Sequence, residues 1–443
     1  MRQVYNWLYV AGLVLSAPYY FLRMWRRGGW REGFAQRFGR YTSKVKQALT
    51  NRHMLWIHAV SVGEVNLCLQ LIRALEPRVP NLKIVVSTTT STGMAELRHK
   101  LPSHIEKIYY PLDRKRYVVR ALRVIRPEAV VLVEAEVWPN FIWRVRDQRI
   151  PLFLVNARLS ERSYRGYRRF AFLFRELFAA FDGVGAQTEA DAGRLREVGC
   201  RPEAVQVVGS LKFDAAARVE ERRPLDVPGM LRQLGVPEGA RVLLGGSTHP
   251  GEETILAEAF LRLRSRYPDL FLVLVPRHFE RGREVGEELK RRGVRFVYRS
   301  EVTPAMRCEP GTVDCLLVNT TGELKLFYEC ATVVFVGKSL TVGGGQNPVE
   351  PAALAKAVVF GPNMQNFSAI VTSFVREQGA VQVRDAPEFE AVLAELLNDA
   401  PRREQLGQNA LKVVRENRGA VERTVEMILR HLAGGELYVA PPP

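Results

Sequence analysis

The sequence predicts an α/β protein built from two doubly wound parallel sheets, one after the other along the chain. The chain has 443 residues, which is too many for one ordinary core. Short runs rich in Val, Ile and Leu alternate with amphipathic stretches, and such continuously apolar runs are typical of parallel strands buried on both faces. The alternation stops once, around residues 217–229, where charges and two prolines predict a linker.

Twelve apolar runs are expected to form the strands. They are residues 54–60, 83–88, 107–112, 129–135, 151–156 and 183–187 before the linker, and residues 241–247, 270–276, 294–300, 315–319, 332–338 and 357–361 after it. Helices are expected at residues 65–76, 251–267 and 386–399, and a long charged helical stretch at residues 401–432. Ligands bind beyond the carboxyl ends of such strands, so the cleft between two such domains is the expected site.

The amino-terminal segment differs from the rest of the chain. Residues 7–22 carry no charge, and an arginine-rich stretch follows them. A spanning helix needs about 20 apolar residues, so this short run can either cross a membrane or lie in its interface. A cleaved signal peptide is the rival interpretation, but its positive charges would precede the apolar run. We expect a retained anchor, with the arginines on the cytoplasmic side.

Composition limits the partners. Lys and Arg number 64 against 47 Asp and Glu, and the formal charge of +17 favours nucleic acid, an anionic membrane surface or a phosphorylated substrate. The five cysteines form no CxxC pair and are expected to be free thiols in a reducing compartment. The seven histidines form no HxxxH pair, so a dedicated metal site is not expected.

Carboxylates follow two of the predicted strands of the first domain. Glu64 lies three residues after Ser61, which is the pattern of a helix capping box, and the alternative is a general base facing the cleft. Glu134 and Glu136 end a strongly apolar strand, either as charges favoured by a helix dipole or as functional carboxylates. Neither pair of alternatives is decided by the local pattern.

Polar loops follow several other strands. The sequences STTTSTG at residues 87–93 and GGSTHPGEE at residues 245–253 offer hydroxyls and backbone amides for anion or sugar contacts, or simply cap helices. Arg277 and His278 follow a strand that ends in Pro276, and Arg277 is suited to a phosphate or to stacking on a base.

A glycine-rich loop precedes a helix in the second domain. Gly343, Gly344 and Gly345 come before Asn347 and Glu350, and free backbone amides with the helix dipole would make an anion site there. Glu350 could accept ribose hydroxyls. The loop is neither GxGxxG nor a Walker A sequence, which disfavours a dehydrogenase or a P-loop ATPase. A nucleotide-sugar transferase fits better.

Together, these motifs resemble a known family. WIHAVSVGEV, STTTSTG, VEAEVWPN, VNARLSERS, GSTHPGEE, LVPRH, GGGQNPVEPA and FGPNMQNF occur in order across residues 56–367. With the apolar amino terminus, they resemble bacterial 3-deoxy-D-manno-octulosonic acid (Kdo) transferases of lipopolysaccharide synthesis. Gln346 and Lys338 depart from the family pattern, which usually has His and a small residue at these positions.

The resemblance implies a GT-B glycosyltransferase, with two Rossmann-like domains facing across a cleft and an apolar membrane-anchor helix. The expected parts are an anchor (1–45), an acceptor domain (46–220), a CMP-sugar domain (221–400) and a carboxyl-terminal helix and tail (401–443). The implied reaction is an inverting transfer from CMP-Kdo to the anionic lipid A precursor lipid IVA. It needs no metal or cofactor and takes place at the cytoplasmic face of the inner membrane.

The resemblance also implies roles for single residues. Glu64 would be the catalytic base and Glu134 the second essential carboxylate. The nucleotide site would comprise Ser247, Thr248, Arg277, His278, Gly343, Gly344, Gly345, Asn347 and Glu350. Acceptor or sugar contacts are expected from Ser61, Gly63, Thr90, Thr92 and Lys212.

Two rival functions are considered. One is a GT-B transferase or epimerase that uses another nucleotide sugar. The other is a membrane-associated nucleic-acid-binding protein, which only the +17 charge favours. The sequence lacks RNP-like aromatics, a zinc pattern and a helix-turn-helix signature, so no nucleic-acid partner is expected.

Overall fold

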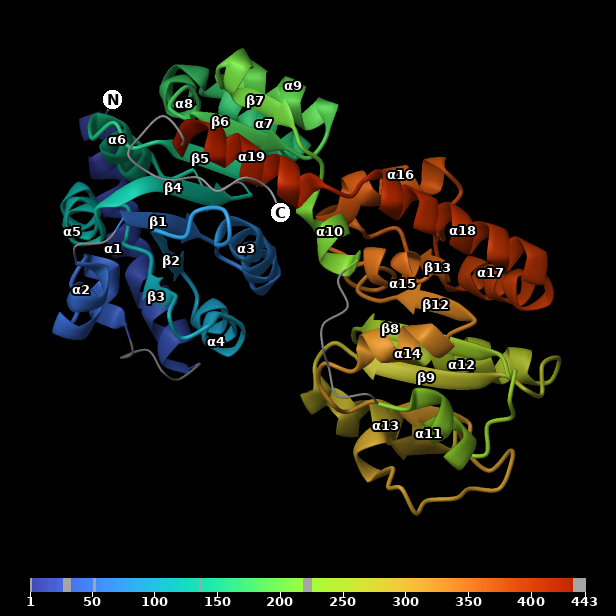
Figure 1. Ribbon diagram of the computed structural model, residues 1–443. Helices are drawn as coiled ribbons and strands as arrows, with labels where there is room; N and C mark the ends of the chain where they lie inside the picture. The colour runs from blue at the N-terminus through green and yellow to red at the C-terminus, as the bar shows by residue number, and fades with distance from the viewer. Residues whose placement is uncertain (1, 27–32, 51–52, 135–136, 218–224, 433–443) are drawn as a thin grey trace. The chain divides into compact units, whose positions relative to one another are not determined.

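The chain forms two compact units, each built around one parallel sheet (Figure 1). The computed structural model describes residues 2–26, 33–50, 53–134, 137–217 and 225–432. The first unit comprises Met1–Ala215 with Arg418–Pro443, and the second comprises Ala216–Asn417. The expected linker partly lies outside the described residues.

The sheet of the first unit has the strand order β3-β2-β1-β4-β5-β6-β7, with all neighbours parallel. Its strands are β1 (His53–His58), β2 (Leu82–Thr88), β3 (Glu106–Tyr109), β4 (Pro127–Val133), β5 (Leu152–Ala157), β6 (Gly183–Ala186) and β7 (Val205–Val207). Its helices are α1 (Arg2–Arg26), α2 (Ser43–Leu49), α3 (Val62–Leu75), α4 (Ser91–Lys100), α5 (Lys115–Ile125), α6 (Pro139–Asp147), α7 (Glu161–Arg169), α8 (Ala171–Phe178), α9 (Glu189–Val198), α10 (Leu211–Ala217) and α19 (Ala420–Leu432). Short 3-10 turns are η1 (Phe34–Phe38) and η2 (Pro202–Ala204).

The sheet of the second unit has the order β10-β11-β9-β8-β12-β13-β14, again parallel. Its strands are β8 (Val242–Thr248), β9 (Phe271–Pro276), β10 (Phe296–Tyr298), β11 (Cys315–Leu317), β12 (Val333–Val336), β13 (Ala357–Phe360) and β14 (Val381–Gln382). Its helices are α11 (Val227–Gln233), α12 (Glu252–Arg264), α13 (Gly282–Arg291), α14 (Leu324–Cys330), α15 (Val349–Ala353), α16 (Ser368–Arg376), α17 (Ala386–Asn398) and α18 (Ala400–Glu416). Its 3-10 turns are η3 (Phe279–Arg281), η4 (Arg299–Glu301) and η5 (Gln365–Phe367).

Both faces of each sheet are covered, as the continuously apolar strands predicted. Val130 and Leu132 of β4 belong to the core under α5, α6, α8 and α9, whereas Val131 belongs to the core under α3 and α19. In the second unit, a Cβ at Gly245 would meet Leu256 of α12, while one at Gly246 would meet Tyr328 of α14. Successive side chains of a strand point to opposite faces, so the buried positions of these strands are mostly apolar or small on both faces, whereas Glu128, near the start of β4, is exposed.

Every predicted strand overlaps an observed one, but two strands were not predicted. These are β7, with three residues, and β14, with two, and both lie at sheet edges. A run this short gives no periodic signal that distinguishes a strand from a loop. The five cysteines are unpaired, as predicted.

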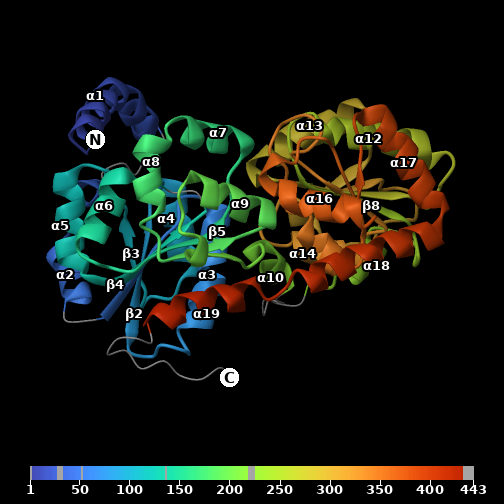
Figure 2. The same cartoon turned by 90° about the horizontal axis from the view of Figure 1, so that it is seen from above.

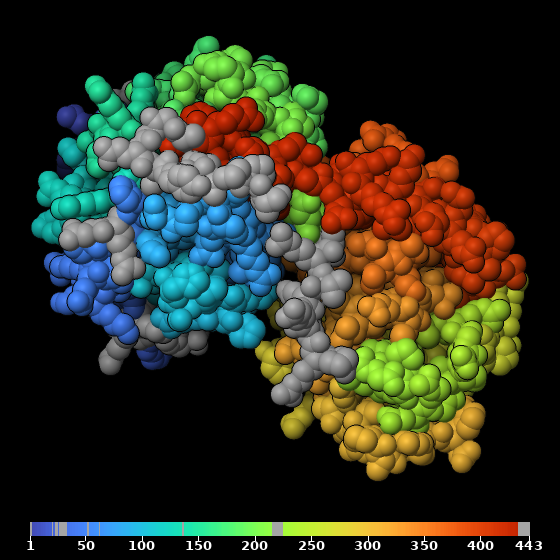
Figure 3. All heavy atoms as spheres, in the orientation of Figure 1, coloured from blue at the N-terminus to red at the C-terminus, as the bar shows by residue number. Residues whose placement is uncertain are grey.

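The long helical stretch predicted for residues 401–432 is instead two helices. It breaks between α18 and α19 at Gly419, which has a left-handed φ of 86°. Asp214 accepts hydrogen bonds from the N–H groups of Gly419 at 2.7 Å and Val421 at 2.8 Å. Helix α19 therefore packs in the first unit, where its red atoms in Figure 3 lie against the green ones.

The apolar amino-terminal run lies in α1, a helix of 25 residues with Pro18 inside it. Arg2 pairs with Asp147 of α6 at 3.0 Å, and the Tyr5 ring packs edge-on to Trp143 at 5.7 Å. Among the described residues, no helix combines the length and the apolar character that crossing a membrane requires.

Candidate active site

The first turn of α3, which follows β1, is closely hydrogen-bonded. Ser61 is the N-cap residue, and its Oγ accepts from the Glu64 N–H at 3.3 Å. The Ser61 hydroxyl donates to Glu64 Oε1 at 2.8 Å, and the Val60 N–H donates to Glu64 Oε2 at 2.7 Å. The capping interaction suggested by the sequence is therefore present, and it fixes the carboxylate of Glu64 beyond the end of β1.

Capping does not prevent Glu64 from acting in chemistry. These two bonds use one lone pair on each carboxylate oxygen, and each carboxylate oxygen has two lone pairs. The residue is 9% exposed, so its charge acts in surroundings of lower dielectric than water. The geometry makes Glu64 both a cap and a fixed carboxylate at the edge where ligands bind such sheets.

Glu134 follows β4 in a backbone conformation that is rare for a residue with a side chain. Its φ is 63°, and its N–H donates to the Val155 carbonyl at 2.9 Å. Such left-handed residues cost on the order of 1–3 kcal/mol and gather at functional sites. Because β4 pairs with β1, with Leu132 beside His58, Glu134 and Glu64 follow neighbouring strands at the same sheet edge. Glu136 lies outside the described residues.

Three polar side chains surround the carboxylate of Glu134. Lys212 Nζ lies 3.6 Å from Oε1, Asn156 Nδ2 lies 3.4 Å from Oε1, and Arg158 Nε lies 3.9 Å from Oε2. Burial lowers the pKa of Lys212, whereas the negative charges of Glu134 and Glu64 raise it. Lys212 thus interacts electrostatically with both carboxylates. The contacts are longer than good hydrogen bonds, which leaves these groups able to change partners.

Sequence analysis missed Asn156 and Arg158. Asn156 is buried with a φ of 53°, and its Oδ1 accepts from the Leu211 N–H at 3.1 Å, which fixes the start of α10 next to Lys212. Both residues lie in the VNARLSERS motif; Asn156 is near the end of β5, the strand beside β4, and Arg158 follows that strand. Their place at the end of a predicted strand was the signal by which the sequence could have indicated them.

The other predicted acceptor contacts mostly shape the loop. Thr90 caps α4 by accepting from the Gly93 N–H at 3.0 Å, and its hydroxyl donates to the Val60 carbonyl at 3.1 Å. The Thr92 hydroxyl donates to Thr90 Oγ1 at 3.4 Å. Gly63 is exposed, and a Cβ there would meet nothing closer than Ser61 Oγ at 3.8 Å. A side chain at Gly63 would therefore have space around its Cβ.

In the second unit, cationic side chains follow the two central strands. Arg277 and His278 are exposed after β9, and the His278 ring lies 6.0 Å from the ring of His249, which follows β8. Burial lowers the pKa of His249, the Ser247 carbonyl and the charge of Glu252 raise it in part, and the positive charge of Lys338 lowers it. Lys338 follows β12, the other neighbour of β8, with a left-handed φ of 59°. The sequence prediction included Arg277 and His278 but not His249.

The predicted nucleotide contacts from the end of β8 differ from each other. Ser247 is half-buried with a φ of 54°, and its carbonyl interacts with His249 Nδ1 at 3.2 Å. Thr248 is fully buried, and its hydroxyl donates to Glu253 Oε1 at 2.9 Å. The side chain of Thr248 therefore supports the loop rather than facing a ligand.

The expectation of free amides in the glycine loop is wrong at two positions. The Gly344 N–H donates to Gln365 Oε1 at 2.8 Å, and the Gly345 N–H donates to the Lys338 carbonyl at 2.8 Å. Glycine is needed at Gly345 for a steric reason, because its φ is 75° and a Cβ would lie 2.5 Å from Met364 Sδ. The loop is closed by its own hydrogen bonds, so side chains must supply more of any anion binding.

Asn347 and Glu350 lie together at the start of α15. Asn347 Oδ1 accepts from the Val349 N–H at 3.1 Å, and its Nδ2 donates to Glu350 Oε1 at 3.3 Å. Lys325 Nζ lies 3.9 Å from the same oxygen of Glu350. The pair thus forms the helix start that the sequence predicted next to the glycine loop.

Glu252 is a structural residue that sequence analysis did not identify. It is fully buried, and its carboxylate accepts four backbone hydrogen bonds of 2.7–3.0 Å, from His249, Lys338, Ser339 and Leu340. Successive backbone N–H groups in this arrangement form an anion-binding concavity. The carboxylate of Glu252 occupies it and joins the loop after β12 to the start of α12. Among the described residues, no group of three His, Cys, Asp or Glu side chains could hold a metal ion.

Comparisons with known proteins decide the family. Residues 32–215 match the family model described as 3-Deoxy-D-manno-octulosonic-acid transferase (kdotransferase). The 3-deoxy-D-manno-octulosonic acid transferase of Haemophilus influenzae is 32% identical over 404 residues, which cover 91% of this chain and 92% of that protein. This chain belongs to the 3-deoxy-D-manno-octulosonic acid transferase family. The Bordetella pertussis protein of the same name is 33% identical over 435 residues, covering 95% of this chain and 98% of that protein.

Solved structures add the fold. UDP-GlcNAc 2-epimerase from Neisseria meningitidis, bound to UDP-GlcNAc, is similar with a TM-score of 0.57 and 14% identity, covering 85% of this chain and 100% of that chain. Members of the Kdo transferase family are glycosyltransferases, and the two units with parallel sheets have the GT-B type of fold. The family and the two-domain α/β architecture predicted from the sequence are therefore confirmed.

Proposed function

We propose that this member of the Kdo transferase family transfers Kdo from CMP-Kdo to a hydroxyl of the lipid A precursor lipid IVA. The observation that carries the proposal is the cluster at the carboxyl edge of the first sheet. There Glu64 and Glu134 follow neighbouring strands, and Lys212 interacts with both. A fixed carboxylate beside a second carboxylate and a cation is suited to taking a proton from a sugar hydroxyl.

In this reaction the first unit holds the acceptor. Glu64 removes the proton of the attacking hydroxyl, whose oxygen forms the new bond to the anomeric carbon of Kdo. The bond from that carbon to the CMP phosphate breaks, and CMP leaves with the electron pair, so the configuration inverts. Glu134, with Lys212 and Arg158, orients the acceptor and balances charge around Glu64. No step in this scheme needs a metal ion or another cofactor.

The second unit holds the nucleotide. Arg277 and Lys338 stabilise the negative charge that develops on the leaving phosphate, as fixed cations placed in advance, and His278 offers a hydrogen bond to it. Asn347 and Glu350 offer hydrogen bonds for the ribose hydroxyls. Lys338 and Gln346 occupy the two positions at which this chain departs from the family pattern. The phosphate of CMP-Kdo would therefore be bound by a lysine side chain rather than by a histidine.

The protein is proposed to act at the cytoplasmic face of a bacterial inner membrane. The support comes from α1, on which Trp7 is 78% exposed and Leu15 is 83% exposed. Large apolar side chains left in water are typical of a surface that contacts a partner or a membrane. An interfacial helix would place the acceptor unit next to a lipid acceptor.

A transfer assay tests the reaction. The purified chain receives CMP-Kdo made in situ and lipid IVA in detergent, and products are read by mass spectrometry. The wild type is expected to add Kdo, while Glu64→Gln loses at least roughly 100-fold in rate because the general base is gone. Glu76→Gln, on the exposed end of the same helix, is the matched control and should retain full activity. No product from a folded wild type that binds CMP would remove the acceptor assignment.

Titration calorimetry tests the donor. We expect CMP to bind and UDP to bind negligibly. The reverse result would favour the rival interpretation, a GT-B enzyme that uses a UDP-sugar, and would contradict the proposal.

A further inference from the structure

A basic groove lies between α1 and α5 in the first unit. Its volume is about 630 Å³, within the roughly 300–1,000 Å³ of small-ligand sites. Asn6, Trp7 and Val10 of α1 line one side. The other side is lined by Val119 and five cations at or in α5, which are Arg114, Lys115, Arg116, Arg120 and Arg123. Figures 1 and 2 both place α1 beside α5.

The groove exists because α1 is fixed just before α5 begins. The Tyr5 hydroxyl donates to Asp113 Oδ2 at 2.7 Å, and the Asp113 N–H donates to the Tyr9 hydroxyl oxygen at 3.0 Å. Asp113 also accepts from the N–H groups of Asn140 and Phe141 at the start of α6. Its buried carboxylate is thereby used in holding α1 and α6, and it does not neutralise the cations of α5.

The five cations have no ion-pair partner among the residues that the structure describes. Arg116, Arg120 and Arg123 follow one face of α5, at spacings of four and three residues, opposite the buried Val118, Ala121 and Leu122. The first turn of α5 contains no acidic residue, and three of the cations lie at its positive end. Like charges at this spacing, and cations at a helix amino terminus, are both unfavourable, so a bound anion would relieve two repulsions at once.

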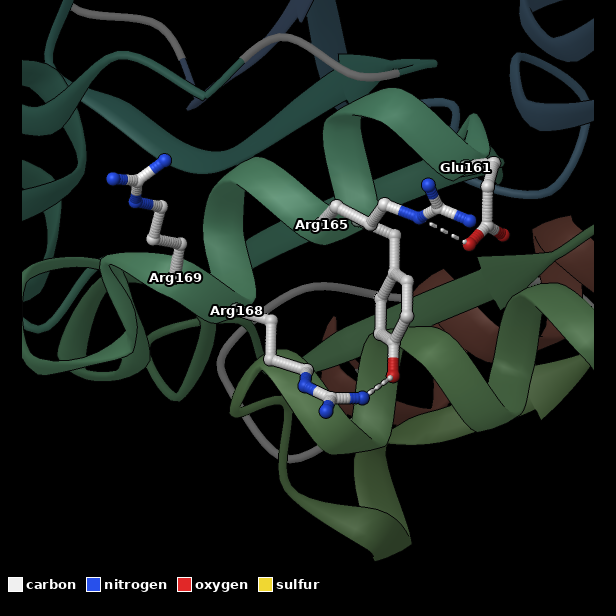
Figure 4. A pocket seen from close by; sticks show the side chains of 5 residues that line it. Glu161, Arg165, Arg168 and Arg169 are labelled. Carbon is white, nitrogen blue, oxygen red and sulfur yellow. Dashed lines mark hydrogen bonds and ion pairs between the residues drawn. The ribbon is translucent and has the colours of Figure 1, made fainter.

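A second arginine-rich pocket, on α7, differs in this respect (Figure 4). Arg165 Nε pairs with Glu161 at 3.0 Å, and Arg168 donates to the Tyr164 hydroxyl at 3.1 Å, while Arg169 lies apart from both. Glu161 also pairs with Arg194 at 2.8 Å. Arg165 of α7 therefore has an acidic partner, whereas among the described residues none of the five cations at or in α5 has one.

The apolar side of the groove indicates which anion fits. Trp7 is 78% exposed at its rim, and Leu8, Val14 and Tyr19 are also exposed along α1. Exposed tryptophan and aliphatic side chains beside a row of cations are typical of a surface at the boundary between lipid headgroups and acyl chains. A free phosphate ion would gain nothing from the apolar side.

We propose that the α1–α5 groove binds the phosphate of an anionic phospholipid headgroup of the membrane surface, with Trp7 and the apolar residues of α1 in the adjoining acyl region. This inference rests on the membrane-associated part of the proposed function. The groove is distinct from the carboxylate cluster of Glu64 and Glu134, and it serves attachment rather than chemistry.

Vesicle sedimentation with the full chain tests the site. Vesicles of phosphatidylcholine alone are compared with vesicles that also contain phosphatidylglycerol. The wild type is expected to prefer the anionic vesicles. The combined change Arg116→Gln, Arg120→Gln and Arg123→Gln should weaken that binding by roughly 100-fold, about fivefold for each cation. Circular dichroism should show unchanged folding, because Arg116 and Arg123 are exposed and Arg120 is half-exposed.

A matched variant distinguishes binding at this groove from attraction by the overall positive charge of the protein. Arg283→Gln, Lys290→Gln and Arg291→Gln remove the same charge from exposed positions on α13 of the second unit. This variant should keep at least most of the wild-type preference. An equal loss in both variants would overturn the proposal in favour of non-specific attraction.

Two further arms identify the source of the phosphate. Inorganic phosphate, added at the same molar concentration as the phospholipid in the vesicles, should not release the protein from them. Release would overturn the choice of a lipid headgroup. With the lipid acceptor dispersed in detergent, the KM for the acceptor should be the same in the triple Arg116, Arg120 and Arg123 variant as in the wild type. A raised KM would instead make the groove an acceptor subsite, and would overturn the proposal while leaving the transferase function intact.

Discussion

Glu134 and Glu252, one acidic residue at the carboxyl edge of each sheet, are held in opposite ways. In the first unit, the side-chain contacts of Glu134 with Asn156, Lys212 and Arg158 are long, at 3.4–3.9 Å. In the second unit, the buried carboxylate of Glu252 is saturated by four backbone hydrogen bonds of 2.7–3.0 Å. Arg277 and His278, which follow the neighbouring strand β9, are exposed.

This difference separates the two tasks that the proposed reaction requires. A carboxylate with weak contacts can exchange them for a substrate hydroxyl, whereas a saturated one is a structural link. Both edges nevertheless contain non-glycine residues with left-handed φ at or just beyond the ends of strands, namely Glu134 and Asn156 in one unit and Ser247 and Lys338 in the other. Backbone strain therefore marks both edges, and the number and length of the hydrogen bonds to the carboxylate distinguish Glu134 from Glu252.

The largest effect is expected from Glu252→Gln, which tests the structural side of the comparison. An amide places an N–H donor against two backbone N–H donors and loses their charge-assisted bonds, which costs about 3 kcal/mol. The melting temperature of the second unit, with its roughly 200 residues, should fall by about 6–12 °C. CMP affinity should fall with it, because Lys338 loses its anchor.

Glu258→Gln on the same helix is the control for this prediction. Glu258 is 43% exposed and pairs with Arg292 at 3.4 Å, so its loss should change the stability by less than about 1 kcal/mol. Equal effects of the two variants in thermal denaturation would show that burial of Glu252 has no special role.

Glu134→Gln tests the functional side of the comparison. Because its contacts are long, we expect a change in melting temperature of less than about 2 °C but a loss in kcat/KM of roughly 100-fold, or about 2.7 kcal/mol. Steady-state kinetics and melting curves provide both numbers. Glu128→Gln, at the exposed amino end of the same strand, should leave kcat/KM unchanged. A large loss of stability in Glu134→Gln, with activity retained, would assign Glu134 to the structural class.

A smaller effect on stability is expected from replacing His58, the last residue of β1. It is fully buried, stacks on Tyr110 at 3.8 Å, and contacts Ser87 Oγ at 2.9 Å. Burial lowers the pKa of His58 to about 3, so between pH 6.5 and pH 3 the unfolded chain binds a proton that the folded chain does not. Stability therefore falls as the pH falls through this window, by about 2 kcal/mol between pH 6.5 and pH 5.

Urea unfolding at pH 7 and pH 5 measures this loss. His58→Gln should lose about 2 kcal/mol less than the wild type over that interval. His53→Gln, at the exposed amino end of β1, should behave as the wild type does. An unchanged pH dependence in His58→Gln would mean that other groups cause the acid sensitivity.

Most of the fold could be predicted because the strands are long, central and apolar on both faces. The strands β7 and β14 escaped prediction because each is too short to show a period. The break at Gly419 also escaped it, since the charged pattern continues through the break and the cause is Asp214, more than 200 residues earlier. Such a bond depends on which segments meet in the folded chain.

The site was predicted unevenly for the same reason. Motif order located Glu64, Glu134, Arg277 and His278, and the capping pattern of Ser61 and Glu64 was local enough to be visible in the sequence. Asn156 and Arg158 were missed because their relevance depends on the strand order, which sets β5 beside β4. The free amides expected in the glycine loop are occupied because Gln365 and Lys338 fold back onto it.

The sequence alone determined the two parallel sheets, the family and the strand ends that carry polar groups, because periodicity and motif order are properties of consecutive residues. Only the tertiary structure decided which carboxylate is saturated and which keeps weak contacts. It also decided that five cations of α5 face α1 without acidic partners among the described residues. Charge balance depends on distances between side chains, and those distances are set by packing rather than by position along the chain.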